Sequence, residues 1–113
     1  MILAMNKPSE ILQGTLDLLI LRTLELGPLH GVAIADRIEQ LSRGVFSVGP
    51  GSLFPALHRL ADKGWIEGEW TEVDGRRVKA YTLTRSGMAQ LGAEKRNWQK
   101  ILVAMNRVLV GEV

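Results

Sequence analysis

One stretch of the sequence, residues 49–66, carries the side chains whose types and spacing best suit chemistry with a partner. It predicts a single helix, with Ser52 as the N-cap, Pro55 in the first turn and Gly64 as the left-handed residue that ends it. At about 100° per residue, hydrogen-bonding and cationic side chains fall on the face opposite the leucines. That face contains Ser52, Pro55, His58, Arg59 and Asp62. Because a helix N-terminus is electropositive, the face suits an anionic partner; a solvated surface helix is the alternative.

A β-hairpin is predicted directly after this helix. Residues 65–73 and 76–83 flank Asp74-Gly75, a pair that favours a type I′ turn. A two-residue turn fixes the register of the strands. Each cross-strand pair then has a physical cause, such as opposite charge, a cation–π contact, a tyrosine covering a glycine, or buried apolar surface. The expected pairs are Val73 with Arg76, Glu72 with Arg77, Trp70 with Lys79, Gly68 with Tyr81, and Ile66 with Leu83.

The tip of the hairpin carries three cations, Arg76, Arg77 and Lys79, within four residues. Such cations neutralise phosphates or enter a minor groove. On the preceding helix, Arg59 has the geometry for a bidentate contact with guanine. The helix and the hairpin together therefore predict binding to double-stranded DNA. In one alternative the charged tip only keeps the hairpin soluble, and in another the module binds proteins instead of DNA.

The sequence holds no constellation of catalytic residues. It has no cysteine, which excludes disulfides, thiolate metal sites and a cysteine nucleophile. His30 lies at an expected helix start and is interpreted as a capping residue. His58 lies beside Arg59, whose charge disfavours a metal. No phosphate-binding glycine loop, zinc-protease motif or nucleophile elbow occurs. We expect a protein that is not an enzyme and needs no cofactor or metal.

Length and composition indicate a single soluble domain. The chain has 113 residues, 46% of them hydrophobic, which is ample for a core. Its net charge of +2 is too small to identify an anionic partner, so the clustering of charge matters more. The densest apolar run, residues 18–21, is bracketed by Asp17 and Arg22 and is far shorter than the roughly 20 residues of a membrane span. We expect a cytoplasmic location and no membrane partner.

The remaining residues predict a mainly α fold with a small β-hairpin, namely a winged helix-turn-helix followed by a long C-terminal dimerisation helix. Residues 1–10 are expected to form an N-terminal arm, residues 11–83 the winged helix-turn-helix domain, and residues 84–113 the dimerisation helix. Within them we expect helices over residues 11–26, 30–42 and 84–109, the last capped by Thr84, and a connector over residues 45–48 long enough for one brief strand.

Two features predict a homodimer. The first helix has apolar residues on two faces, one of which includes Leu18 and Leu21, so we expect a second element, such as another subunit, to cover it. The last helix carries a heptad-like seam of apolar residues with Lys95 as its polar member. The apolar members are Leu91, Trp98, Leu102, Met105 and Leu109. Two copies of Trp98 near the two-fold axis could enclose a flat aromatic or apolar effector; plain core packing is the alternative.

Three motifs stand at a specific spacing along the chain: Leu29-His30-Gly31 after Gly27-Pro28; the run 51–60 followed by Gly64-Trp65-Ile66; and Tyr81-Thr82-Leu83-Thr84 with Gly87. Their combination closely resembles the PadR family of transcriptional regulators over about residues 13–109. The resemblance implies a winged-helix domain, a dimer formed by the C-terminal helix with the first helix, and usually repression that a ligand or stress relieves. It implies DNA contacts from the hairpin cations and from Ser52, Phe54, Pro55, His58 and Arg59.

The chain departs from the family pattern at two positions. Phe54 stands where the family usually has tyrosine, so a hydroxyl contact to a phosphate is absent there. Val32 stands where an aromatic residue is common. The C-terminal part consists of one helix, so any effector is expected to bind at the dimer interface.

Overall fold

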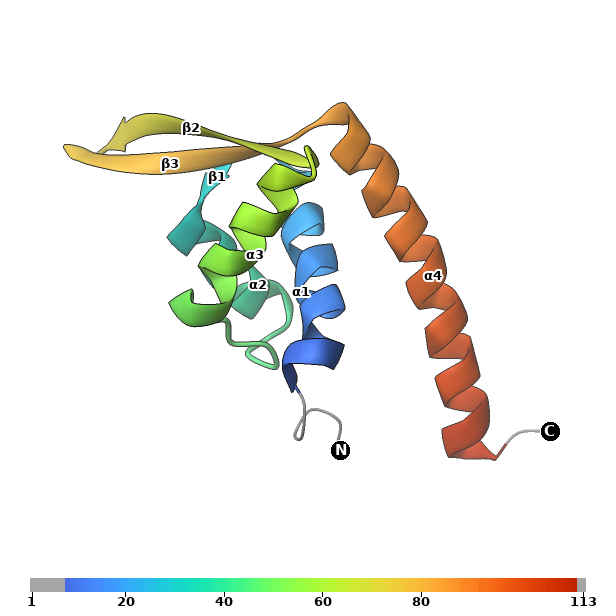
Figure 1. The fold of residues 1–113 in the computed structure, drawn as a ribbon. Coiled ribbons are helices and arrows are strands. Elements are labelled where there is room, and N and C mark those ends of the chain that lie inside the picture. The colour runs from blue at the N-terminus through green and yellow to red at the C-terminus, as the bar shows by residue number, and fades with distance from the viewer. Residues whose placement is uncertain (1–7, 112–113) are drawn as a thin grey trace.

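The computed structural model describes residues 8–111 and contains four helices and a three-stranded antiparallel sheet within them (Figure 1). Helices α1, α2 and α3 form a bundle beneath the sheet, and α4 runs down the other side of α1 (Figure 1). The predicted winged helix-turn-helix with a long C-terminal helix is thereby confirmed. The elements are α1 (Pro8–Leu24), β1 (Leu29–His30), α2 (Gly31–Leu41), α3 (Pro50–Asp62), β2 (Ile66–Val73), β3 (Arg76–Leu83) and α4 (Arg85–Val110).

The core lies where α2, α3, α4 and β3 meet α1. Helix α2 buries Ile34 and Ile38, four residues apart, and α3 buries Leu53, Leu57 and Leu60 at the same helical spacing. Burying one such side chain contributes roughly 1.5–3 kcal/mol. The fully buried side chains from all parts of the chain are Ile20, Leu21, Ile34, Leu57, Leu60, Ile66 and Leu91.

Helix α1 is the central helix, and this corrects the first argument for a dimer. It contacts α2, α3, α4 and β3. Leu18 is 8% exposed and Leu21 is fully buried, so elements of the same chain cover the second apolar face. Leu91 of α4 is also buried in this core. The prediction that Leu18, Leu21 and Leu91 face a partner is therefore wrong for this chain.

The start of α1 also differs from the prediction. Residues 8–10, assigned to the arm, belong to α1, and residues 1–7 lie outside the described part of the chain. The helix ends at Leu24, and Gly27 has a φ of +144°, consistent with a break before Pro28. Within residues 8–111, no helix combines the length and the apolar character needed to span a membrane.

The ends of α3 are set by glycine and proline. Gly49 is the N-cap and Pro50 the first helical residue, so Ser52 is not the cap and Pro55 lies in the second turn. Proline suits the first position because no intrahelical partner is lost there. At the other end, Gly64 has a φ of +76° and the Trp65 N–H donates to the Leu60 carbonyl over 3.1 Å. This left-handed cap is the one predicted.

The hairpin has the predicted register. All five expected pairs are formed, from Ile66 with Leu83 to Val73 with Arg76. Asp74 and Gly75 have φ values of +53° and +76°, the positive values that a type I′ turn requires. The third strand was not predicted, because β1 is only two residues long; it pairs with Tyr81 and Ala80 of β3. Residues 45–48, where a brief strand was considered possible, form no strand.

The start of α4 is hydrogen-bonded to the cap that follows α3. Thr84 is the N-cap, as predicted, and its hydroxyl accepts the Gly87 N–H over 3.0 Å. The Thr84 hydroxyl also donates to the Gly64 carbonyl over 2.7 Å, and the Ser86 hydroxyl donates to the same carbonyl over 3.0 Å. The backbone at Gly87 approaches so closely that a Cβ there would lie 2.0 Å from the Trp65 carbonyl oxygen. Helix α4 is therefore fixed relative to α3 at this junction.

Gly87→Ala tests this junction. Because the added Cβ meets backbone that cannot move aside alone, we expect the free energy of unfolding to fall by about 3 kcal/mol. Gly92→Ala is the matched control, since its Cβ would meet only Arg96 at 3.5 Å. In that helical position alanine is expected to stabilise by up to about 1 kcal/mol. Urea unfolding of both variants gives the comparison, and equal stabilities would contradict the close approach at Gly87.

Candidate nucleic-acid interface

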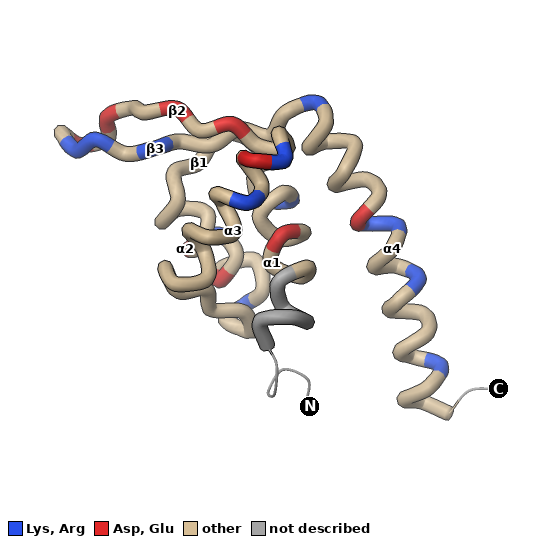
Figure 2. Tube along the Cα trace, viewed as in Figure 1, with Lys and Arg blue, Asp and Glu red and all other residues tan. Residues whose placement is uncertain are grey.

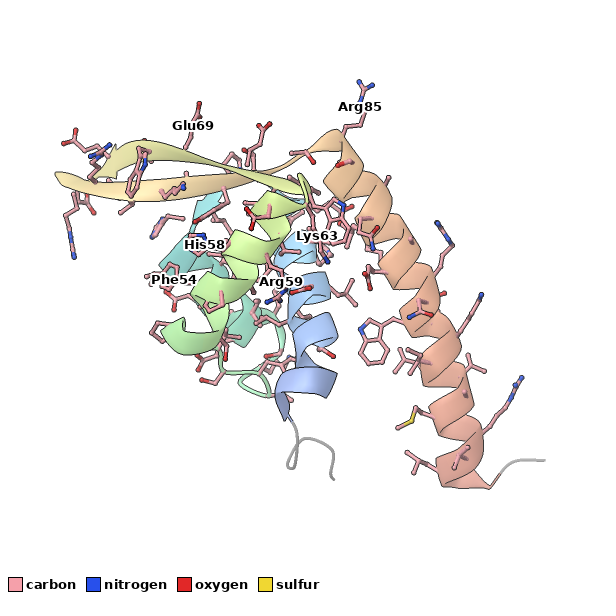
Figure 3. All side chains as sticks on the ribbon, viewed as in Figure 1. Phe54, His58, Arg59, Lys63, Glu69 and Arg85 are labelled. Carbon is pink, nitrogen blue, oxygen red and sulfur yellow. The ribbon has the colours of Figure 1, made fainter. Side chains whose placement is uncertain are left out.

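The exposed face of α3 carries four of the five helix residues predicted to contact DNA. Ser52, Phe54, Pro55 and His58 are exposed. Figure 3 shows Phe54 and His58 on the side of α3 away from α1, below the hairpin. This face presents a hydroxyl, an imidazole and apolar surface, with no acidic side chain among these four residues. Such a set suits base edges and the sugar–phosphate backbone of a duplex.

Arg59 also starts from this side of α3, but its side chain turns toward α1. Its Nη2 lies 2.5 Å from Oδ1 of Asp17 in α1, and the side chains are only 28% and 13% exposed. Figure 3 shows Arg59 directed toward α1. Because Arg59 follows Ser52 by seven residues, it lies only about 20° from that exposed residue around the helix, so helical position does not turn it inward. The Asp17 carboxylate therefore fixes which way the guanidinium turns.

Sequence reasoning missed Asp17. Its only signal is that it is an acidic residue at the edge of the apolar run 18–21 in a helix that is central to the fold. Burial raises the pKa of Asp17 above its usual value, and the hydrogen bond from Arg59 opposes that rise without cancelling it. Asp17 and Arg59 therefore form a partly buried ion pair between α1 and α3.

Phe54 packs across the start of α2. A Cβ built at Gly31 would lie 3.0 Å from Cε1 of the Phe54 ring, so the glycine leaves room for the ring. The ring is nevertheless 41% exposed. Phe54 therefore contributes both to the packing of α3 on α2 and to the exposed surface.

The hairpin has two faces of different chemistry. Alternation along paired strands places Trp70, Arg77 and Lys79 on the same face as Tyr81, which is buried over the helices. The Trp70 ring is 58% exposed, with Cζ of Arg77 4.7 Å and Nζ of Lys79 5.6 Å from its centroid. The predicted contact with Lys79 is confirmed, and Arg77 comes closer. This face lies on the same side of the sheet as α3.

The opposite face of the hairpin is acidic. It carries Glu67 and Glu69, and Glu69 points away from the helices (Figure 3). The acidic residues lie on β2 and at the turn, whereas the cations lie on β3 (Figure 2). From residue 66 to residue 83 four acidic side chains oppose three basic ones, a net charge of −1. Arg76 also lies on this face and Glu72 on the other, so the wing is basic on one strand while both of its faces carry mixed charge.

The last turns of α4 expose an apolar stripe. Leu102, Met105 and Leu109 are 60%, 49% and 75% exposed, and they lie on one side of the helix by their spacing. Trp98, one step toward the domain, is partly buried and packs against the core. Nearby, Nζ of Lys95 lies 3.3 Å from Oε1 of Glu25, in the turn that follows α1. The structure thus separates the predicted seam into a half that packs on its own chain and a half that does not.

Within residues 8–111, no group of three or more histidine or acidic side chains is arranged to hold a metal ion.

The fold and the exposed face of α3 beside a wing define a winged helix-turn-helix protein. Residues 20–93 match the model of the transcriptional regulator PadR-like family, and the chain belongs to this family. The resemblance inferred from the motifs is thereby confirmed.

Three relatives give the scale of the similarity. Transcriptional regulator Rv3488 of Mycobacterium tuberculosis is 36% identical over 73 residues, and the match covers 65% of this chain and only 65% of that protein. A PadR-like transcriptional regulator from Bacillus cereus has a TM-score of 0.77 and 28% identity, covering 92% of this chain and 100% of that chain. Bacillus subtilis PadR, solved in complex with operator DNA, has a TM-score of 0.64 and 30% identity, covering 70% of this chain and 45% of that chain.

Trp70→Ala tests the organisation of the wing. Without the ring, Arg77 and Lys79 lose their shared platform, and we expect the hairpin to open more readily by about 1 kcal/mol. Hydrogen exchange of the β2 and β3 amides measures this opening. Glu69→Ala, on the opposite face of the same strand, is the control and is expected to change exchange little. Equal exchange in the two variants would show that the ring does not hold the cations.

Proposed function

We propose that this chain is a homodimeric regulator that binds a pseudo-palindromic operator in double-stranded DNA and represses transcription. The observation that carries the proposal is the placement of the exposed face of α3 and the cationic face of β3 on one side of the sheet. The operator complex of Bacillus subtilis PadR supports the same use of the fold. The rival reading, a winged helix that binds proteins only, shares the fold but not the need for this cationic face.

In the proposed complex α3 enters the major groove. Ser52 and His58 reach base edges or nearby phosphates, and Pro55 supplies apolar contact. Arg77 and Lys79 meet phosphates beside the groove, and Arg76 at the tip reaches phosphates or a minor groove. Phe54 makes apolar contact with the backbone without the hydroxyl of the usual tyrosine. Arg59 does not reach the bases in this arrangement.

The exposed stripe of α4 is the proposed dimer seam. Three large apolar side chains, Leu102, Met105 and Leu109, lie on one side of the helix and are 49–75% exposed among the described residues. Apolar surface of this kind usually marks an interaction site. In a dimer whose two-fold axis passes through the α4 seam, the two α3 helices would lie about one helical turn of DNA apart. An aromatic or apolar effector bound near Trp98 would change that spacing and relieve repression.

Binding to DNA is tested by fluorescence anisotropy with duplexes selected from a random pool, over a range of salt. Arg77→Ala and Lys79→Ala are each expected to weaken binding to all sequences and to lower the salt slope by roughly one unit. His58→Ala is expected to change the preferred sequence at a cost of about 1–3 kcal/mol. Glu69→Ala is the control on the opposite face and should not lower the slope. No selectable duplex, together with assembly that ignores DNA and salt, would favour the protein-binding rival.

The dimer seam is tested by sedimentation equilibrium. Leu102→Glu places an unpaired carboxylate in the seam and is expected to weaken dimerisation at least about a hundredfold. Val103→Glu is the matched control, because Val103 is on the same helix and 51% exposed but points away from the seam. Equal dimerisation constants for the two variants would place the interface elsewhere.

A further inference from the structure

One ion pair joins the helix that faces DNA in the proposed complex to the central helix of the domain. Nη2 of Arg59 in α3 donates to Oδ1 of Asp17 in α1 over 2.5 Å, across 42 residues of sequence. Both side chains are largely removed from solvent, at 28% and 13% exposure. It links two elements whose relative rotation decides which residues of α3 point outward.

Stability alone does not explain this pair. Taking a carboxylate out of water is costly, and burial outweighs the Arg59 contacts in setting the pKa of Asp17 above its usual value. An apolar pair of similar volume is often as stable as a buried ion pair. What the charged pair adds is direction, since the Asp17 oxygen accepts from one orientation of the guanidinium.

We infer that Asp17 and Arg59 are positioning residues for DNA binding, which hold α3 in the rotation that exposes Ser52, Pro55 and His58 and keep the Arg59 guanidinium off the DNA. The inference rests on the proposed function. It reverses the role that the sequence suggests for Arg59, from reading bases to orienting the helix that reads them.

Whether removal of Asp17 weakens or strengthens DNA binding distinguishes a positioning role from an effect of charge alone. Lys63 and Glu94 also act on the Asp17 carboxylate, so its surroundings are mixed in charge. Removing an acidic residue from a protein that binds a polyanion should by itself strengthen binding. It should strengthen binding further if Asp17 merely withholds Arg59 from the phosphates. A positioning role predicts the opposite, weaker binding.

The experiment measures affinity and salt slope on a selected duplex by fluorescence anisotropy. Asp17→Ala is expected to weaken binding about tenfold although it removes a negative charge. Arg59→Ala is expected to weaken binding by a similar factor, and the double variant by no more than either single change. None of the three should lose the unit of salt slope that a phosphate contact supplies. Glu25→Ala is the matched control, since it removes an exposed acidic residue of the turn that follows α1, where it pairs with Lys95; it should bind at least as tightly as the parent.

Arg59→Gln covers the case in which Asp17→Ala does not fold, which urea unfolding reports. Glutamine can still donate to Asp17 but carries no charge, so it should restore most of the affinity lost in Arg59→Ala with the parental slope. Asp17→Ala binding as tightly as Glu25→Ala, or Arg59→Gln as weak as Arg59→Ala with a slope lowered by a unit, would overturn the inference alone. Failure of the parent protein to bind any selected duplex would instead overturn the proposed function and, with it, this role.

Discussion

The Gly64 carbonyl is the point on which the arrangement of the helices depends. It belongs to the left-handed cap that ends α3, and it accepts hydrogen bonds from Thr84 and Ser86, which begin α4. The close approach of Gly87 to the Trp65 carbonyl locks the same junction. The helix with the exposed polar face and the helix with the exposed apolar stripe are therefore rigidly connected, although the hairpin separates them in sequence.

The parts of the fold that depend on neighbours in sequence could be predicted. The Asp74-Gly75 turn fixed the register of the whole hairpin, and the Gly64 and Thr84 caps followed from local chemistry. The residues that pack over a helix come from distant parts of the sequence, so they cannot be predicted from its neighbours. The second apolar face of α1 was assigned to a partner, whereas its own chain supplies the cover and buries Leu21 completely. Strand β1 was missed because two residues carry no alternation pattern.

The candidate site likewise contains residues whose placement could be predicted from local sequence and one whose placement could not. Helical periodicity placed Ser52, Pro55 and His58 away from the leucines, and all three are exposed. Arg59 lies close to Ser52 around the helix, but its side chain is long enough to turn back toward α1. Only the partner Asp17 decides the matter, and it lies 42 residues earlier in the chain. The same is true of the wing, where the composition of β3 indicates a basic surface but pairing with β2 brings acidic side chains beside its cations.

These restrictions bear on how such a protein would obtain affinity for DNA. With Arg59 held by Asp17 and the hairpin at a net charge of −1, few cations of one chain face the proposed DNA surface. Each neutralised phosphate contributes a limited, salt-dependent part of the binding free energy. Two chains joined along α4 would double the contacts and make the second one effectively intramolecular. The gain depends on a fixed separation of the two α3 helices, because a mobile link would lower the effective concentration. A rigid α3–α4 junction and an oriented α3 meet that requirement. The rigid junction would therefore compensate for the weak binding of DNA by a single chain.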